Sequence, residues 1–97
     1  MLHKMKSEIA LLGRHIQVLR AVYEHGPIGI IKLSEMLSLP HHRIRYSLRV
    51  LEQLGYILAS PSGAVTTERA HTLLHSLNED LDDLVHLIES IRDRSNT

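Results

Sequence analysis

The chain has 97 residues and a mass of 11.0 kDa, which allows one compact core with some appended structure and excludes a multidomain enzyme. Hydrophobic residues make up 43% of the sequence and charged residues 23%, as in globular proteins, so the chain should fold. The only aromatic residues are three tyrosines. A core built from Leu, Ile, Val and Met favours packed helices.

The absence of cysteine excludes disulfides, thiolate zinc sites and a cysteine nucleophile. The first apolar run, residues 9–13, ends at Arg14 and is too short for a signal peptide or a membrane span. We therefore expect a soluble, cytoplasmic protein without a membrane partner.

The formal net charge is zero, but the charges are unevenly distributed. Residues 1–60 carry eight Lys or Arg and four Glu, a net charge of +4, whereas residues 61–97 carry three Arg and seven Asp or Glu, a net charge of −4. This asymmetry is typical of a module that approaches a polyanion with one end.

The first half of the chain predicts two helices and a short strand. Apolar residues spaced by three and four positions predict a helix over residues 4–24, with residues 1–13 as a helical N-terminal extension because Gly13 weakens the middle of the pattern. His25, Gly26 and Pro27 end this helix. The β-branched run 28–31 predicts a short strand, and a brief second helix follows over residues 33–37 until Ser38 and Pro40 interrupt it. The apolar residues of the first pattern are Met5, Ile9, Leu12, Ile16, Leu19 and Tyr23.

A third helix is predicted over residues 41–54, with Pro40 at its start and Gly55 as its C-cap. Its apolar face consists of Ile44, Leu48, Leu51 and Leu54. Residues 56–60 and 64–66 predict a β-hairpin around the turn 61–63. Thr67 is a good N-cap for a final helix, and Glu68 in its first turn suits the helix dipole.

Three segments carry a resemblance to a known family: Gly26-Pro27-Ile28, Leu33 to Pro40, and Ile44 to Ile57 with its ending Leu54-Gly55-Tyr56-Ile57. Together they resemble the winged helix-turn-helix domain of prokaryotic transcriptional regulators of the arsenic-repressor-like and multiple-antibiotic-resistance-regulator-like groups, over about residues 15–70. The resemblance implies a mainly α fold with a small β-hairpin, and a recognition helix 41–54 that enters the major groove of double-stranded DNA. The departures are Ser38 and Pro40 in the turn and a hairpin, residues 60–65, without Lys or Arg.

Seven residues of the third helix and one before it are candidate DNA contacts. Arg reads guanine bidentately and Gln reads adenine, whereas Lys, Tyr and His suit phosphate. The alternative is that these side chains form an ordinary solvated helix face. The candidates are His41, His42, Arg43, Arg45, Tyr46, Arg49, Gln53 and Lys32, and Arg14 and Arg20 are further candidates for phosphate contact.

The last helix carries an unbroken heptad pattern, which predicts a coiled-coil-like homodimer interface over residues 71–97 that follows a winged helix-turn-helix domain at residues 1–70. Its predicted interface residues are Leu74, Leu77, Leu81, Leu84, Ile88 and Ile91. Because Leu73, Val85 and Leu87 widen the stripe, this helix should also pack on the N-terminal half of the first helix. The alternative is a fourth helix that covers its own domain.

No motif for catalysis is present, so we expect no enzyme and no cofactor. His71 and His75, four residues apart on the last helix, are weak candidates for a metal site. The leading hypothesis is a homodimeric, sequence-specific DNA-binding transcriptional regulator. The alternatives are a winged-helix protein-interaction module without specific DNA binding and a regulator that responds to a metal or small-molecule effector.

Overall fold

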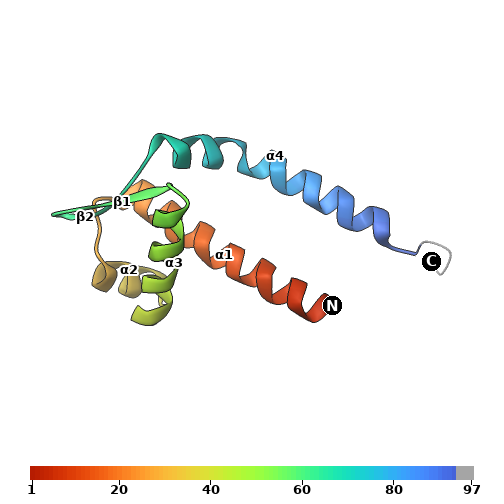
Figure 1. Ribbon diagram of the computed structural model, residues 1–97, viewed down its shortest axis with the longest axis horizontal. Coiled ribbons are helices and arrows are strands. Elements are labelled where there is room, and N and C mark those ends of the chain that lie inside the picture. The colour runs from red at the N-terminus through yellow and green to blue at the C-terminus, as the bar shows by residue number, and fades with distance from the viewer. Residues whose placement is uncertain (94–97) are drawn as a thin grey trace.

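The computed structural model describes residues 1–93 and is mainly helical, with a two-stranded antiparallel hairpin, which confirms the expected mixture of elements (Figure 1). The elements in chain order are α1 (Leu2–His25), α2 (Ile30–Leu37), α3 (His41–Gln53), β1 (Ile57–Ser60), β2 (Gly63–Thr66) and α4 (Glu68–Ile91). In the hairpin, Ile57 pairs with Thr66 and Ser60 pairs with Gly63. None of the helices in residues 1–93 combines the length and apolar character needed to cross a lipid bilayer.

One apolar core holds α2, α3, the hairpin and the first turn of α4 against the C-terminal half of α1. Val18, Leu19 and Val22 of α1 are buried, and Leu33 of α2 and Ile44 of α3 lie against them with no exposed surface. The remaining members of the core are Ala21, Ile28, Leu51, Ile57 and Ala70. Leu54, predicted on the apolar face of α3, is 51% exposed because α3 ends at Gln53, before that position.

The short strand predicted over residues 28–31 is wrong. Only Ile28 forms a bridge: its N–H donates to the carbonyl of Ala64 at 3.2 Å, and the N–H of Ala64 donates to its carbonyl at 2.8 Å. Helix α2 begins two residues later, at Ile30, with Gly29 as N-cap. Ile30 is helical there because its packing against the core outweighs its weak intrinsic preference for strands, whereas Ile31 is 66% exposed in the same helix.

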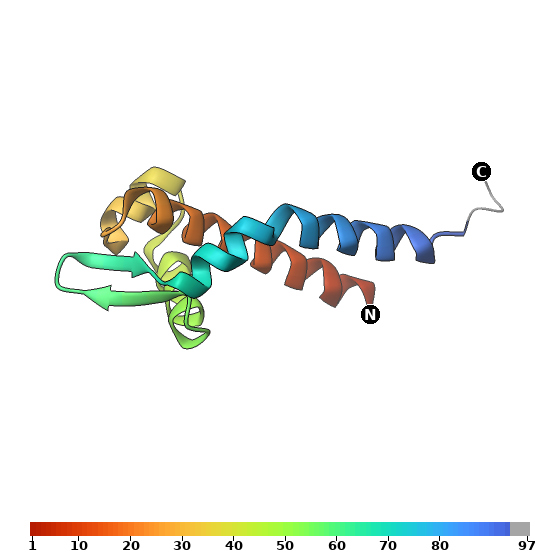
Figure 2. The ribbon, with the colours of Figure 1, turned by 90° about the horizontal axis from the view of Figure 1, so that it is seen from above.

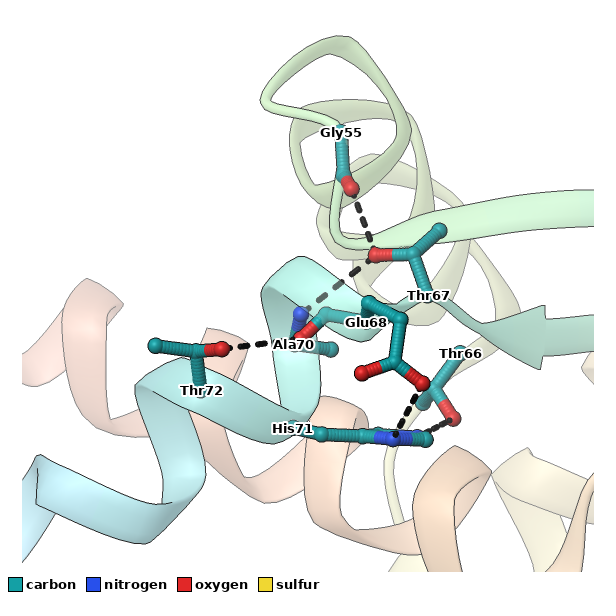
Figure 3. A network of polar contacts seen from close by, with 7 residues as sticks. All are labelled: Gly55, Thr66, Thr67, Glu68, Ala70, His71 and Thr72. Atoms are coloured by element: carbon teal, nitrogen blue, oxygen red, sulfur yellow. Dashed lines mark hydrogen bonds and ion pairs between the residues drawn. The ribbon is translucent and has the colours of Figure 1, made fainter.

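The start of α4 is fixed as the sequence predicts. The Thr67 hydroxyl accepts a hydrogen bond from the N–H of Ala70 at 3.3 Å, and it donates to the carbonyl of Gly55 at 2.7 Å (Figure 3). Gly55 follows α3 with a positive φ of 84°, a conformation that suits glycine. Thr67 therefore caps α4 and also ties it to the end of α3.

Two half-helices extend from the globular end on the same side, and Figures 1 and 2 show them as long projections. We call residues 2–13 of α1 the N-terminal arm and residues 78–91 of α4 the C-terminal arm. The molecule measures 57 × 27 × 21 Å. A groove of about 500 Å³ separates the arms near their bases, lined by Ile9, Leu12 and Ile16 on one side and Leu77 and Leu81 on the other.

The expected packing of the last helix on the N-terminal half of the first helix is confined to this groove. Leu77 is 6% exposed, but Ile9, Leu12 and Leu81 are exposed by 50%, 42% and 37%. The arms also separate toward their outer ends (Figure 2). Most of both apolar stripes therefore has no cover within the chain.

Two glycines allow a matched test of the packing. A Cβ on Gly63, whose φ is 127°, would lie 2.6 Å from the backbone of Ile28, whereas a Cβ on Gly13 would meet nothing within 4 Å. We expect Gly63→Ala to lower the free energy of unfolding by about 1–3 kcal/mol. Gly13→Ala should raise it by about 0.5–1 kcal/mol, because alanine is the better helix former. Urea unfolding at one protein concentration measures both, and equal stability of Gly63→Ala and the native chain would contradict the close contact.

Candidate nucleic-acid interface

Helix α3 presents a basic outer face to solvent. Ile44, Ser47 and Leu51 are buried against the core, which directs the opposite side of the helix outward. The exposed candidates on α3 are His41, His42, Arg43, Arg45, Tyr46, Arg49 and Gln53. All seven predicted residues of α3 therefore lie on accessible positions of one short helix.

The cationic side chains of this face are not neutralised. Within residues 1–93, the guanidinium groups of Arg43, Arg45 and Arg49 make no ion pair or side-chain hydrogen bond. Glu52 is the single acidic residue of α3, so the helix has a net charge of +2 with histidine neutral. Unpaired guanidinium groups retain their full capacity to bind phosphate or base edges.

A tight turn connects α2 to α3. Ser38 adopts the left-handed conformation, with φ 54° and ψ 43°, and its N–H donates to the carbonyl of Ser34. The Ser34 hydroxyl donates in turn to the carbonyl of Leu39. Ser38 therefore fills the turn position that glycine often takes, and Ser34 is a stabilising residue that the sequence pattern did not indicate.

The rotation of α3 about its axis is fixed by a buried serine that the sequence analysis missed. Ser47 has no exposed surface, and its hydroxyl oxygen lies 2.8 Å from Nδ1 of His15 and 3.2 Å from Nε of Arg14. Arg14 donates to Ser47, and the serine proton can then satisfy a neutral His15 ring. This polar contact joins α3 to the middle of α1.

Tyr46 and Arg14 belong to the same cluster. The Arg14 guanidinium lies 5.8 Å from the centre of the Tyr46 ring, and the His15 ring lies 5.9 Å from it at a tilt of 37°. Tyr46 remains 46% exposed. Arg14, a candidate for phosphate contact, is therefore occupied in holding α3, whereas Tyr46 still has one accessible side.

The other predicted contacts lie apart from α3. Lys32 is exposed on α2, and Arg20 lines the groove between α1 and α4, which no residue of α3 lines. The hairpin carries no charged residue between Ile57 and Thr66, and Leu58 is 57% exposed on it. The basic surface is therefore concentrated on α3.

The histidine pair on α4 is used differently from a metal site. Nε2 of His71 lies 3.0 Å from the Thr66 hydroxyl, and Nδ1 lies 3.8 Å from a carboxylate oxygen of Glu68 (Figure 3). The Tyr23 ring meets the imidazole edge to face at 5.0 Å. Both nitrogens of His71 thus face Thr66 and Glu68, while His75 lies one turn further along α4. Within residues 1–93, no three His, Asp or Glu side chains gather in a way that would hold a metal ion.

No protein family model and no curated protein matches this chain.

The His15 contact predicts a pH dependence. Burial, together with the neighbouring Arg14 charge, lowers the pKa of His15 below its ordinary value of 6.5. Because the folded state resists protonation, the stability contributed by neutral His15 is complete above about pH 6.5 and is lost as the pH falls below it. Chemical unfolding between pH 7.5 and about 5 should show a smaller loss of stability in His15→Gln than in the native chain. His3→Gln, at an exposed position, is the control and should follow the native profile; identical profiles for all three proteins would contradict the prediction.

Proposed function

We propose that the protein is a homodimeric, sequence-specific DNA-binding regulator of transcription with a winged helix-turn-helix architecture, in which α3 enters the major groove. The observation that carries the proposal is the exposed, unpaired arginine face of α3, held in a fixed rotation by the buried Ser47. In this reading α2, the turn at Ser38 and α3 form the helix-turn-helix, and β1 and β2 form the wing.

The electrostatics support one direction of approach to DNA. Helix α3 has a net charge of +2, whereas residues 79–83 of α4 include four carboxylates and no cation. A polyanion is attracted to the first surface and repelled by the second. With so few positive charges, one protomer binds weakly at physiological salt, and two protomers on one duplex are needed for a stable complex.

A binding survey tests the proposal directly. Fluorescence anisotropy should be measured against promoter fragments of the host genome, including the region upstream of the protein's own gene, at low and at physiological salt. Retention of a few fragments at physiological salt supports a sequence-specific regulator. Uniform binding that disappears with salt reflects only counterion release and overturns the proposal.

Two substitutions on α3 should weaken specific binding without unfolding the protein. Arg45→Ala and Arg49→Ala each remove a guanidinium that makes no ion pair or side-chain hydrogen bond within residues 1–93. We expect each to cost about 1–3 kcal/mol of specific binding free energy, roughly 5- to 150-fold in Kd. Arg92→Ala, which removes an exposed arginine at the far end of α4, is the control. Native affinity in both α3 variants would show that α3 does not read the site.

The proposed dimer interface includes the exposed part of the α4 stripe. Leu74 and Leu77 are drawn into the chain's own packing, whereas Leu81, Leu84, Ile88 and Ile91 are exposed by 37–81%. Ile88→Asp should give a folded monomer, because Ile88 lies outside the core, and operator affinity should fall by roughly 100-fold with the loss of bivalent binding. Sedimentation equilibrium measures the first effect and anisotropy the second.

Leu58→Asp, on the hairpin, is the matched control for Ile88→Asp, because the two side chains are 57% and 52% exposed. The control should dimerise like the native chain. A dimer that survives Ile88→Asp unchanged would place the interface elsewhere.

A second candidate function, a winged-helix module that binds another protein, is favoured by one observation. The hairpin is uncharged and exposes Leu58, which suits an apolar protein contact better than a DNA backbone. This candidate predicts normal dimerisation, no operator, and loss of partner binding in Leu58→Asp.

A further inference from the structure

The N-terminal arm exposes an apolar stripe. The dimer interface proposed above involves only α4 and leaves this stripe uncovered. Leu2, Met5, Ile9 and Leu12 are exposed by 70%, 53%, 50% and 42%, and their spacing puts them on one side of α1. The C-terminal arm carries the parallel stripe that ends at Ile91. Both stripes border the groove at the base of the arms.

We propose that each N-terminal arm packs against the C-terminal arm of a second copy of this chain. The arms of the two copies point in opposite directions, so that they form a four-helix bundle, called antiparallel below, with a globular end at each end. The inference rests on the proposed homodimer and adds the residues that complete its interface. In this bundle, Lys4 and Lys6 form ion pairs with the partner chain's Asp80 and Asp83.

The exposed area fits an occupant of this size. The chain exposes 7267 Å², whereas a compact monomer of 11.0 kDa is expected to expose about 5,600 Å². A standard interface buries about 800 Å² on each partner, so the surplus is large enough to supply the surface that contacts a second copy.

The charges that border the two stripes are complementary. Lys4 and Lys6 lie on the two borders of the α1 stripe, about 100° on either side of Met5. Asp80 and Asp83 lie together on one border of the α4 stripe. Within residues 1–93, the side chains of Lys4, Lys6 and Asp83 make no ion pair or hydrogen bond, and Asp80 accepts only from the Ser76 hydroxyl at 3.1 Å. These charges are therefore available to a partner.

The same charges do not pair within one chain. Lys4 lies five residues beyond Ile9, the outermost residue of α1 that lines the groove, about 7.5 Å at the helical rise. Figure 2 shows the two arms separating toward their outer ends. A partner chain can supply the opposite charge there.

Charge density also selects the relative direction of the arms. In an antiparallel bundle, Lys4 and Lys6 at the tip of one α1 face residues 79–83 of the partner, which contain four carboxylates and no cation. In a parallel bundle they would face the outer end of α4, where Glu89 and Asp93 are matched by Arg92 and Arg94 in the sequence. The antiparallel arrangement gives the stronger attraction, and its two-fold axis repeats each contact once.

A charge-exchange experiment tests the arrangement. One variant carries Lys4→Glu and Lys6→Glu, and the other carries Asp80→Lys and Asp83→Lys. At about 50 mM salt, where screening is weak, each variant alone should dimerise at least about tenfold more weakly than the native chain. An equimolar mixture should recover native affinity, because in the heterodimer both arm pairs are again oppositely charged. Sedimentation equilibrium gives the affinities, native mass spectrometry identifies the heterodimer, and circular dichroism checks the fold.

Three results would overturn the inference. Native dimerisation of the Lys4→Glu, Lys6→Glu variant, with Ile88→Asp monomeric, would leave the α4 interface intact and exclude the N-terminal arm. Failure of the mixture to recover would exclude pairing between chains. A native chain that stays monomeric at all concentrations would remove the homodimer itself. Lys32→Glu, the same charge change on α2, is the control and should dimerise normally.

Discussion

The elements of the globular end share one apolar core with two turns of α1, where Val18, Leu19 and Val22 are almost completely buried. This constraint determines the rest of the molecule. A 24-residue helix is about 36 Å long, and only its C-terminal half is needed to close a core for a chain of this size. The N-terminal half must then extend into solvent, and α4, which leaves the core after Leu77, does the same. The elongated shape follows from two helices that are longer than the core they serve.

The polar contact at Ser47 lies where the globular end meets the N-terminal arm. A buried hydroxyl that receives Arg14 and faces His15 is satisfied only when α3 is rotated so that Ser47 points inward. That rotation places Arg45 and Arg49 outward, since they lie on the other side of the helix. Ile44 and Leu51, buried on the same side of the helix, favour the same rotation through close packing. The hydrogen bonds of Ser47 add a directional constraint that an apolar residue could not supply. Packing and hydrogen bonds together give α3 one defined presentation.

Local signals made most of the fold predictable. The helices follow apolar spacing, the hairpin follows its turn residues, and Thr67 acts as the N-cap that its side chain predicts. The features that the sequence did not predict all depend on contacts between residues that lie far apart in the chain. The run that begins at Ile28 has the β-branched composition of a strand, but only one residue finds a partner there. Ser47 looks like a surface residue until Arg14 and His15 are brought across from α1, some 32 residues away. Heptad spacing likewise cannot distinguish Leu77, which is buried within the chain, from Ile88, which is exposed.

The sequence has no net charge, but its positive and negative charges lie in different parts of the chain. This uneven distribution has a physical consequence in the proposed dimer. The carboxylates at residues 79–83 would repel DNA if they remained unpaired beside it, and the repulsion would offset part of the attraction to α3. Pairing with Lys4 and Lys6 of the partner would offset two of these four carboxylates, and the two α3 faces would then contribute more to the field of the assembly. Dimerisation in this arrangement would thus strengthen DNA binding twice, through bivalent contact and through a smaller opposing charge. Both contributions would depend on salt, but the apolar contacts between the arms would not be screened. The bundle should therefore persist at salt concentrations that release the DNA.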